Sequence, residues 1–127
     1  MSSKELAPDE FELYDLMVTV EGGNFVCRHH SDQGFRVEGE DLIFPEGGRF
    51  SLYAMAALLP LLPAKERPPA SADWMTTDAL IACPDPNCGA RFRITRTAKR
   101  IFRHGDCTVV PLESDPETNF STEENSK

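Results

Sequence analysis

Apolar and β-branched positions near the start of the chain predict a β-hairpin. In the stretch 12–20 (ELYDLMVTV), the second half has an apolar residue at every second position and ends in β-branched residues. Because side chains alternate between the two faces of a strand, this pattern predicts a strand from about Tyr14. Residues 21–24 (EGGN) are a turn signal, and 25–27 (FVC) are then the expected returning strand.

Two short β-rich segments follow the hairpin. Residues 34–38 (GFRVE) and 41–44 (DLIF) combine apolar and β-branched side chains, and Gly39 lies between them. Residues 45–48 (PEGG) are a turn signal that closes the second segment. The pattern therefore predicts two more strands.

One stretch has the composition of a helix. Residues 50–62 (FSLYAMAALLPLL) are rich in Ala and Leu, which are strong helix formers. Pro60 lacks a backbone N–H, so we expect the helix to end or kink there. The proline-rich residues 63–73 (PAKERPPASAD) are predicted to form an extended linker.

The last apolar segments flank a pair of cysteines. Residues 79–82 (ALIA) predict a strand that leads into Cys83, and residues 90–95 (ARFRIT) alternate as a strand does. The loop 84–87 (PDPN) separates Cys83 from Cys88 by four residues. Two thiolates at such a strand–turn–strand junction are typical of a zinc knuckle.

A second group of metal-binding side chains follows the hairpin turn, at Cys27, His29 and His30. One thiolate and one imidazole from this group would complete a Cys3His tetrahedron with Cys83 and Cys88, a ligand set typical of closed structural zinc sites. Soft thiolates favour zinc over magnesium or calcium. A Cys-x2-His arrangement selects His30 and a Cys-x-His arrangement selects His29; we favour His30 and keep His29 as the alternative.

Other interpretations of these side chains stay open. The cysteines could be buried thiols and the histidines surface residues, with no metal between them. Cys107 lies beyond the last predicted strand, and we interpret it as a free thiol in a further strand. A catalytic thiol needs an activating base or a helix N-terminus, and the nearby His104 is weak evidence for one.

Composition and charge narrow the classes of function. The chain has 127 residues, room for one domain, and a formal net charge of −8. Nucleic acids and anionic membranes are bound by basic surfaces, so neither partner is expected. A local basic run is interpreted as a solvated face, or as a docking surface for an acidic partner or for the acidic chain ends. It comprises Arg91, Arg93, Arg96, Lys99, Arg100 and Arg103.

The sequence carries no evident membrane or export signal. No apolar run reaches the roughly 20 residues that span a bilayer. The polar, acidic start of the chain lacks the basic and apolar regions of a signal peptide, which predicts a cytoplasmic protein. In a reducing compartment, four cysteines indicate metal ligands or free thiols rather than disulfides.

These patterns predict a mainly β architecture, a small zinc-ribbon-like β domain with one short helix in the insertion between the two halves of the metal site. We expect an N-terminal arm over 1–12, the zinc-binding domain over 13–112 and an acidic C-terminal tail over 113–127. The sequence contains no G-x-G-x-x-G, P-loop, G-x-S-x-G or H-E-x-x-H motif. A closed four-ligand zinc leaves no position for a reacting water, so no catalytic residue is assigned.

The order of these features resembles the small zinc-containing subunit of the acetone carboxylase and acetophenone carboxylase family. The shared pattern begins at Cys27-Arg28-His29-His30 and continues, after a spacer of some fifty residues, through Asp73-Trp74-Met75 to the knuckle at 83–89. It covers roughly residues 14–96. The short chain and the histidine pair are closer to the acetophenone enzyme's subunit, whereas the four-residue knuckle departs from the two-residue knuckle of the acetone enzyme's subunit.

The resemblance implies a multi-subunit, ATP-dependent ketone carboxylase. Its larger subunits would phosphorylate bicarbonate and ketone and join them, giving benzoylacetate in the acetophenone case. This chain would be the non-catalytic zinc subunit, and only the metal ligands carry over to it. The alternative is a free-standing zinc-ribbon interaction module, and a third hypothesis is a small redox or metal enzyme that uses Cys107 and the histidines.

Overall fold

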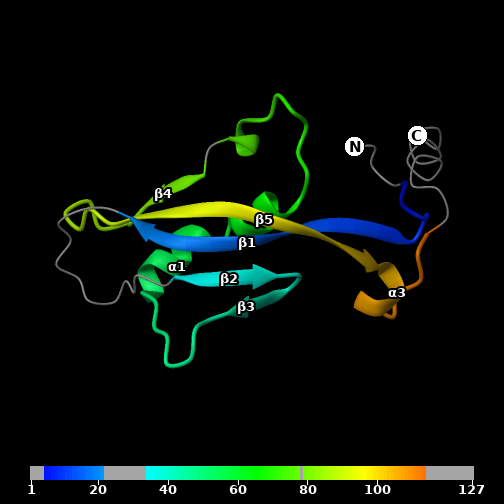
Figure 1. Cartoon of the computed structure of the whole chain (residues 1–127), viewed down its shortest axis with the longest axis horizontal. Coiled ribbons are helices and arrows are strands. Elements are labelled where there is room, and N and C mark those ends of the chain that lie inside the picture. The colour runs from blue at the N-terminus through cyan, green and yellow to red at the C-terminus, as the bar shows by residue number, and fades with distance from the viewer. Residues whose placement is uncertain (1–4, 22–33, 78, 114–127) are drawn as a thin grey trace, which may run out of the picture. The chain divides into compact units, whose positions relative to one another are not determined.

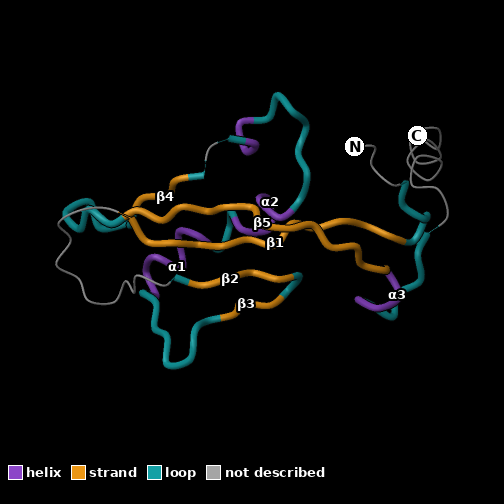
Figure 2. Tube along the Cα trace, viewed as in Figure 1, coloured by secondary structure: helices purple, strands orange, loops and turns teal. Residues whose placement is uncertain are grey.

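The main element of the fold is an antiparallel β-sheet of five strands in the order β3-β2-β1-β5-β4 (Figures 1 and 2). The computed structural model describes residues 5–21, 34–77 and 79–113. The chain divides into two compact units, the body unit (12–100) and the terminal unit (1–11 with 101–127). Helices are few and short within these described ranges, so the prediction of a mainly β chain is confirmed.

The strands follow the apolar pattern of the sequence closely in the body unit. The segments predicted at 34–38, 41–44 and 79–82 are strands, and the first strand begins at Glu10, earlier than the predicted Tyr14. The predicted returning strand at 25–27 lies outside the described residues. The strands are β1 (Glu10–Glu21), β2 (Phe35–Glu38), β3 (Asp41–Ile43), β4 (Leu80–Ala82) and β5 (Arg91–Arg103).

One face of the sheet supplies the core of the body unit. Alternate side chains of three neighbouring strands point into it, and two helices cover them. Burying each aliphatic or aromatic side chain contributes about 1.5–3 kcal/mol, so this cluster is the main source of stability. Its members include Leu16 and Val18 of β1, Phe35 and Val37 of β2, Phe92 and Ile94 of β5, and Ala54, Leu58 and Leu62 from the helices.

The predicted helix is divided at Pro60 into α1 (Leu52–Leu58) and α2 (Leu62–Glu66). Ser51 caps α1, because its hydroxyl accepts the Ala54 N–H at 3.2 Å. The linker predicted over 63–73 is wrong at its start. Pro63 lies in the first turn of α2, where a missing N–H costs no hydrogen bond, and only after α2 does the chain extend towards the short 3-10 helix η1 (Trp74–Thr76).

The C-terminal elements differ most from expectation. The last strand, predicted over 90–95, runs on to Arg103 as β5, and α3 (His104–Cys107) follows it. Cys107 is an exposed free thiol as predicted, but it ends a short helix rather than lying in a strand. Throughout the described ranges, no helix has the length and apolar character to cross a membrane.

Candidate metal centre

The turn between β4 and β5 brings Cys83 and Cys88 together. Cys83 directly follows β4, and its backbone N–H donates to the Ala90 carbonyl at 3.0 Å. This bond continues the antiparallel pairing of the two strands, so the chain returns beside Cys83 just after it has passed Cys88. Gly89, with φ of +84°, adopts the left-handed conformation that lets the chain re-enter the sheet.

Asp85 organises the turn between the two cysteines. Its carboxylate Oδ1 accepts the Asn87 N–H at 3.0 Å, and its carbonyl accepts the Cys88 N–H at 3.0 Å. Its own backbone N–H donates to the sulfur of Cys83. One residue therefore fixes the approach of both thiols, a role that the sequence analysis did not assign to it. Asp at this position of a turn is the only signal that could have indicated it.

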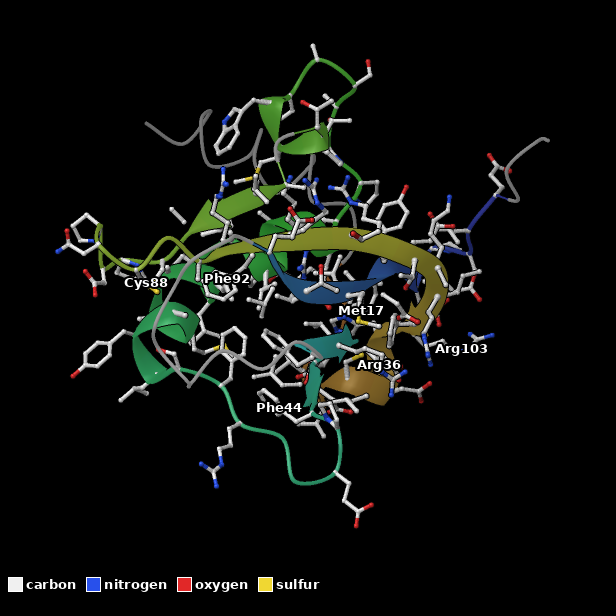
Figure 3. All side chains as sticks on the ribbon, turned by 60° about the vertical axis from the view of Figure 1, so that its left-hand side comes forward. Met17, Arg36, Phe44, Cys88, Phe92 and Arg103 are labelled. Atoms are coloured by element: carbon white, nitrogen blue, oxygen red, sulfur yellow. The ribbon has the colours of Figure 1, made fainter. Side chains whose placement is uncertain are left out.

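The two thiols lie at the edge of the hydrophobic core. Cys88 is 6% exposed and belongs to the core cluster, beside Phe92 at the start of β5 (Figure 3), while Cys83 is half-buried against the same cluster. Burial raises the pKa of Cys83, and a hydrogen bond with the Cys88 thiol acts in the same direction, whereas the backbone N–H of Asp85 lowers it. Cys83 therefore favours its thiol form when no cation is present, and a bound cation would favour the thiolate instead.

This arrangement has the chemistry of half a structural zinc site. Two convergent thiols, a backbone N–H directed at one sulfur and a left-handed glycine after the second cysteine fit a metal held at a knuckle. The other proposed ligands, Cys27, His29 and His30, lie outside the described residues. Among the residues that are described, no three Cys, His, Asp or Glu side chains gather closely enough to hold a metal by themselves.

The segment that carries the other proposed ligands is attached at the end of the sheet that holds the cysteine turn (Figure 1). Residues 22–33 follow Glu21 at the end of β1, and the Glu21 carboxylate pairs with Arg93 of β5, with 3.3 Å between Oε1 and Nη2. The chain resumes at Gly34, which packs against the backbone of Val18 just before β2. Both attachment points are therefore on the body unit: Glu21 ends β1, which neighbours β5 in the sheet, and Gly34 precedes β2, which pairs with β1.

The basic run of β5 is largely used inside the fold. Four of its side chains pair with carboxylates, and Arg96 donates from Nε to the Lys65 carbonyl at 2.8 Å. Part of the run contacts the acidic N-terminal residues, as one of the interpretations from the sequence expected, and docking of an acidic partner stays a prediction. The carboxylate partners are Glu21 for Arg93, Glu12 for Lys99, Asp15 and Glu38 for Arg100, and Asp9 and Glu10 for Arg103.

A shallow groove beside β3 is a weaker candidate site. Its volume of about 190 Å³ is smaller than the roughly 300–1,000 Å³ of most small-molecule sites. The one charged group in its lining, Arg36, is bound to Glu38 at 2.7 Å. Figure 3 shows Met17, Arg36 and Phe44 around it; the full lining is Met17, Phe35, Arg36, Ile43, Phe44 and Pro45. This lining offers no acid–base pair or nucleophile.

Comparison with known proteins gives no match: no protein-family model, no curated protein and no solved structure is significantly similar to this chain. The features that bear on function are therefore the chemistry of the cysteine turn and the order of motifs in the sequence.

Proposed function

We propose that this chain is a non-catalytic, structural zinc-binding subunit of a multi-subunit ATP-dependent ketone carboxylase. The proposed ligands are Cys27, Cys83, Cys88 and His30, with His29 as the alternative histidine. The observation that carries the zinc part of the proposal is the pair of neighbouring thiols at the β4–β5 turn, held by Asp85. The parent enzyme is inferred from the resemblance in motif order alone.

Chain geometry is compatible with this ligand set. Cys27 is six residues beyond Glu21, and an extended chain of that length reaches about 20 Å. Glu21 is anchored to Arg93 on the strand that follows the cysteine turn, so the segment that carries position 27 starts from a neighbour of that strand.

A zinc ion held this way would act on structure rather than chemistry. Four protein ligands would close its coordination, so it would join the segment 22–33 to the β4–β5 turn without activating water. Structural zinc contributes on the order of 10 kcal/mol of apparent binding free energy, which exceeds the entropic cost of closing the loop from 27 to 83. The ion would thus stabilise one end of the sheet.

Exposed apolar side chains support a subunit role. Leu52 and Tyr53 of α1 are 79% and 75% exposed, and Trp74 of η1 is 60% exposed. Side chains of this size gain most when a partner covers them, because burial removes their apolar surface from water. A small chain with such residues and no catalytic motif is suited to a permanent complex.

The test is to purify the full-length protein from its natural source and identify what accompanies it. We expect about one zinc per chain and a stable complex with larger subunits that carboxylate a ketone at the expense of ATP. Zinc without any such complex would favour the free-standing zinc-ribbon module. Protein that retains no zinc after purification without chelators would contradict the zinc proposal itself.

The histidine ligand is tested separately. We expect His30→Ala to lower zinc retention more than His29→Ala, each measured by metal analysis after the same chelator wash. The two variants are matched controls, because they remove the same side chain from adjacent positions. A loss confined to His29→Ala would assign the ligand to position 29 and reject the Cys-x2-His arrangement.

A further inference from the structure

The cysteine turn contains two thiols that differ in access but touch each other. The Cys83 and Cys88 side chains are joined by a hydrogen bond, so their sulfur atoms are neighbours in the reduced protein. Cys83 is half-buried, whereas Cys88 is 6% exposed and packs in the core. An oxidant arriving from solvent therefore meets Cys83 first, and the nearest described thiol behind it is Cys88.

Cys107 is in a different situation. It is exposed at the end of α3 in the terminal unit, and the ring nitrogen Nε2 of His104 on the same helix is hydrogen-bonded to the Val110 carbonyl at 2.7 Å. This histidine nitrogen is engaged and does not act on the Cys107 sulfur. Access to solvent alone does not make a thiol redox-active; a second thiol must be at hand to resolve its first oxidation product.

We infer that Cys83 and Cys88 form a reversible thiol–disulfide pair that responds to hydrogen peroxide. In the first step, Cys83 loses its proton and attacks one peroxide oxygen as the thiolate, which is the reactive form of cysteine. The O–O bond breaks, Cys83 sulfenic acid forms, and the leaving hydroxide takes up the proton and departs as water. In the second step, the Cys88 sulfur attacks the Cys83 sulfur, the S–O bond breaks, and a second water leaves. The two thiols lose two electrons and two protons, and the peroxide takes up both.

The turn favours closure of the bond within one chain. Only four residues separate the cysteines, and two of them are prolines, whose fixed φ limits the conformations that the open loop can sample. The bonds from Asn87 and Cys88 to Asp85 hold the loop closed before any oxidation. The second thiol is thus at a high effective concentration relative to any thiol on another molecule.

Oxidation would also regulate the proposed zinc site, and this consequence rests on the proposed function. A disulfide removes two of the four proposed ligands at once, because a metal binds the thiolate and not the disulfide. The zinc subunit would then lose its metal under peroxide and regain it when a thiol reductant restores both cysteines. The disulfide itself requires only the two thiols and can be tested whether or not zinc binds.

The experiment treats the full-length protein, with and without prior chelation, with hydrogen peroxide. Peptide mapping then locates the linked cysteines, and a zinc-sensitive dye follows metal release. We expect a loss of two hydrogen atoms per chain and a Cys83–Cys88 link that dithiothreitol reverses. If the protein carries zinc, we expect it to be released in step with the disulfide. Cys107→Ser, outside the turn, should behave as the unaltered protein does.

The Cys88→Ser variant separates the two steps. In Cys88→Ser the resolving thiol is gone, so Cys83 should stop at the sulfenic acid, which a cyclic dione labels. A link from Cys83 to Cys27 or Cys107, or over-oxidation of Cys83 without a disulfide in the unaltered protein, would overturn the inference. Disulfide formation in a protein that never bound zinc would contradict the proposed function and leave this inference standing. Zinc binding without disulfide formation would contradict this inference and leave the proposed function standing.

Discussion

The Arg100 guanidinium of β5 binds the Asp15 carboxylate of β1, with Nε 2.8 Å from each carboxylate oxygen. Asp15 is 8% exposed, so this contact neutralises a carboxylate that is largely removed from water. Arg100 also reaches Glu38 of β2, with 3.3 Å between Nη2 and Oε1. One basic side chain thereby ties three strands of the body unit together and holds β5 in the sheet well beyond its last core residue, Ile94.

Replacing Arg100 with Ala is predicted to lower the free energy of unfolding by about 1–2 kcal/mol, because the variant leaves Asp15 buried without its partner. Arg103→Ala is the matched control on the same strand. The side chains of Arg103 and its partner Asp9 are 57% and 45% exposed, and such surface pairs contribute less than about 1 kcal/mol. Urea unfolding of both variants measures the difference. Equal losses of unfolding free energy would show that the Arg100 contact stabilises the protein no more than the exposed Arg103 pair does.

The same contact explains why the sequence predicted only part of β5. The segment 90–95 alternates regularly between apolar and polar residues because Phe92 and Ile94 face the core. This pattern can be recognised from the sequence alone. Beyond it, the charged stretch up to Arg103 has no such alternation. Its place in the sheet depends on carboxylates of β1, which are some 80 or more positions away in sequence, as Asp15 is from Arg100. Local pattern does not reveal pairs of that kind.

The metal half-site, too, could be predicted only in part from the sequence. Cys83 and Cys88 could be placed at a turn because strand patterns and turn residues flank them. The role of Asp85 could not, because it depends on which backbone N–H groups the turn directs towards one carboxylate. The α2 helix was missed because Pro63 reads as a linker residue, although proline is well accommodated in a first helical turn.

Asp85→Ala is predicted to destabilise the protein by about 1 kcal/mol and to weaken zinc retention, because the N–H of Asn87 loses its acceptor. Asp85→Asn keeps an acceptor oxygen at the same place and should retain most of both properties. Thermal melts and competition with a chelator compare the two. If both variants behave alike, the side-chain bond is not what holds the turn.

Glu66 of α2 is predicted to make stability depend on pH. Its side chain is 6% exposed, and Oε2 has no hydrogen-bond partner among the described residues. Burial raises the pKa of Glu66 above 4.5; Arg67 opposes this, while Asp15 and Glu40 add to it. The folded state therefore favours the protonated acid. Its contribution to stability is fully present below pH 4.5 and is lost as the pH rises through the higher folded-state pKa.

Glu66→Gln removes the charge and nearly preserves the shape of the side chain. We expect this variant to be more stable than the unaltered protein at neutral pH and the difference to fade below pH 4.5. Denaturant unfolding across this range measures it, with Glu46→Gln on an exposed position as the control. A Glu66→Gln protein that is less stable at neutral pH would mean that the ionised carboxylate is favoured in the fold.

Gly34 is predicted to tolerate no side chain. A Cβ there would lie 1.8 Å from the Val18 carbonyl oxygen, and its φ is +60°. Gly47 has a φ of +73° but open space around it, so Gly47→Ala isolates the conformational cost, about 1 kcal/mol. We expect Gly34→Ala to cost about 3 kcal/mol in unfolding free energy, because β2 must shift away from β1. Similar losses of unfolding free energy in the two variants would contradict the close approach of Gly34 to the Val18 carbonyl.

The most direct test of the central claim is the zinc content of the full-length protein after a chelator wash, measured with Cys83→Ser and Cys107→Ser beside it. We predict about one zinc per chain in the unaltered protein and in Cys107→Ser, and a loss of zinc with a lower melting temperature in Cys83→Ser, because structural zinc contributes directly to folding. An unaltered protein without zinc, or equal effects of the two substitutions, would contradict the claim that the β4–β5 turn holds a structural metal.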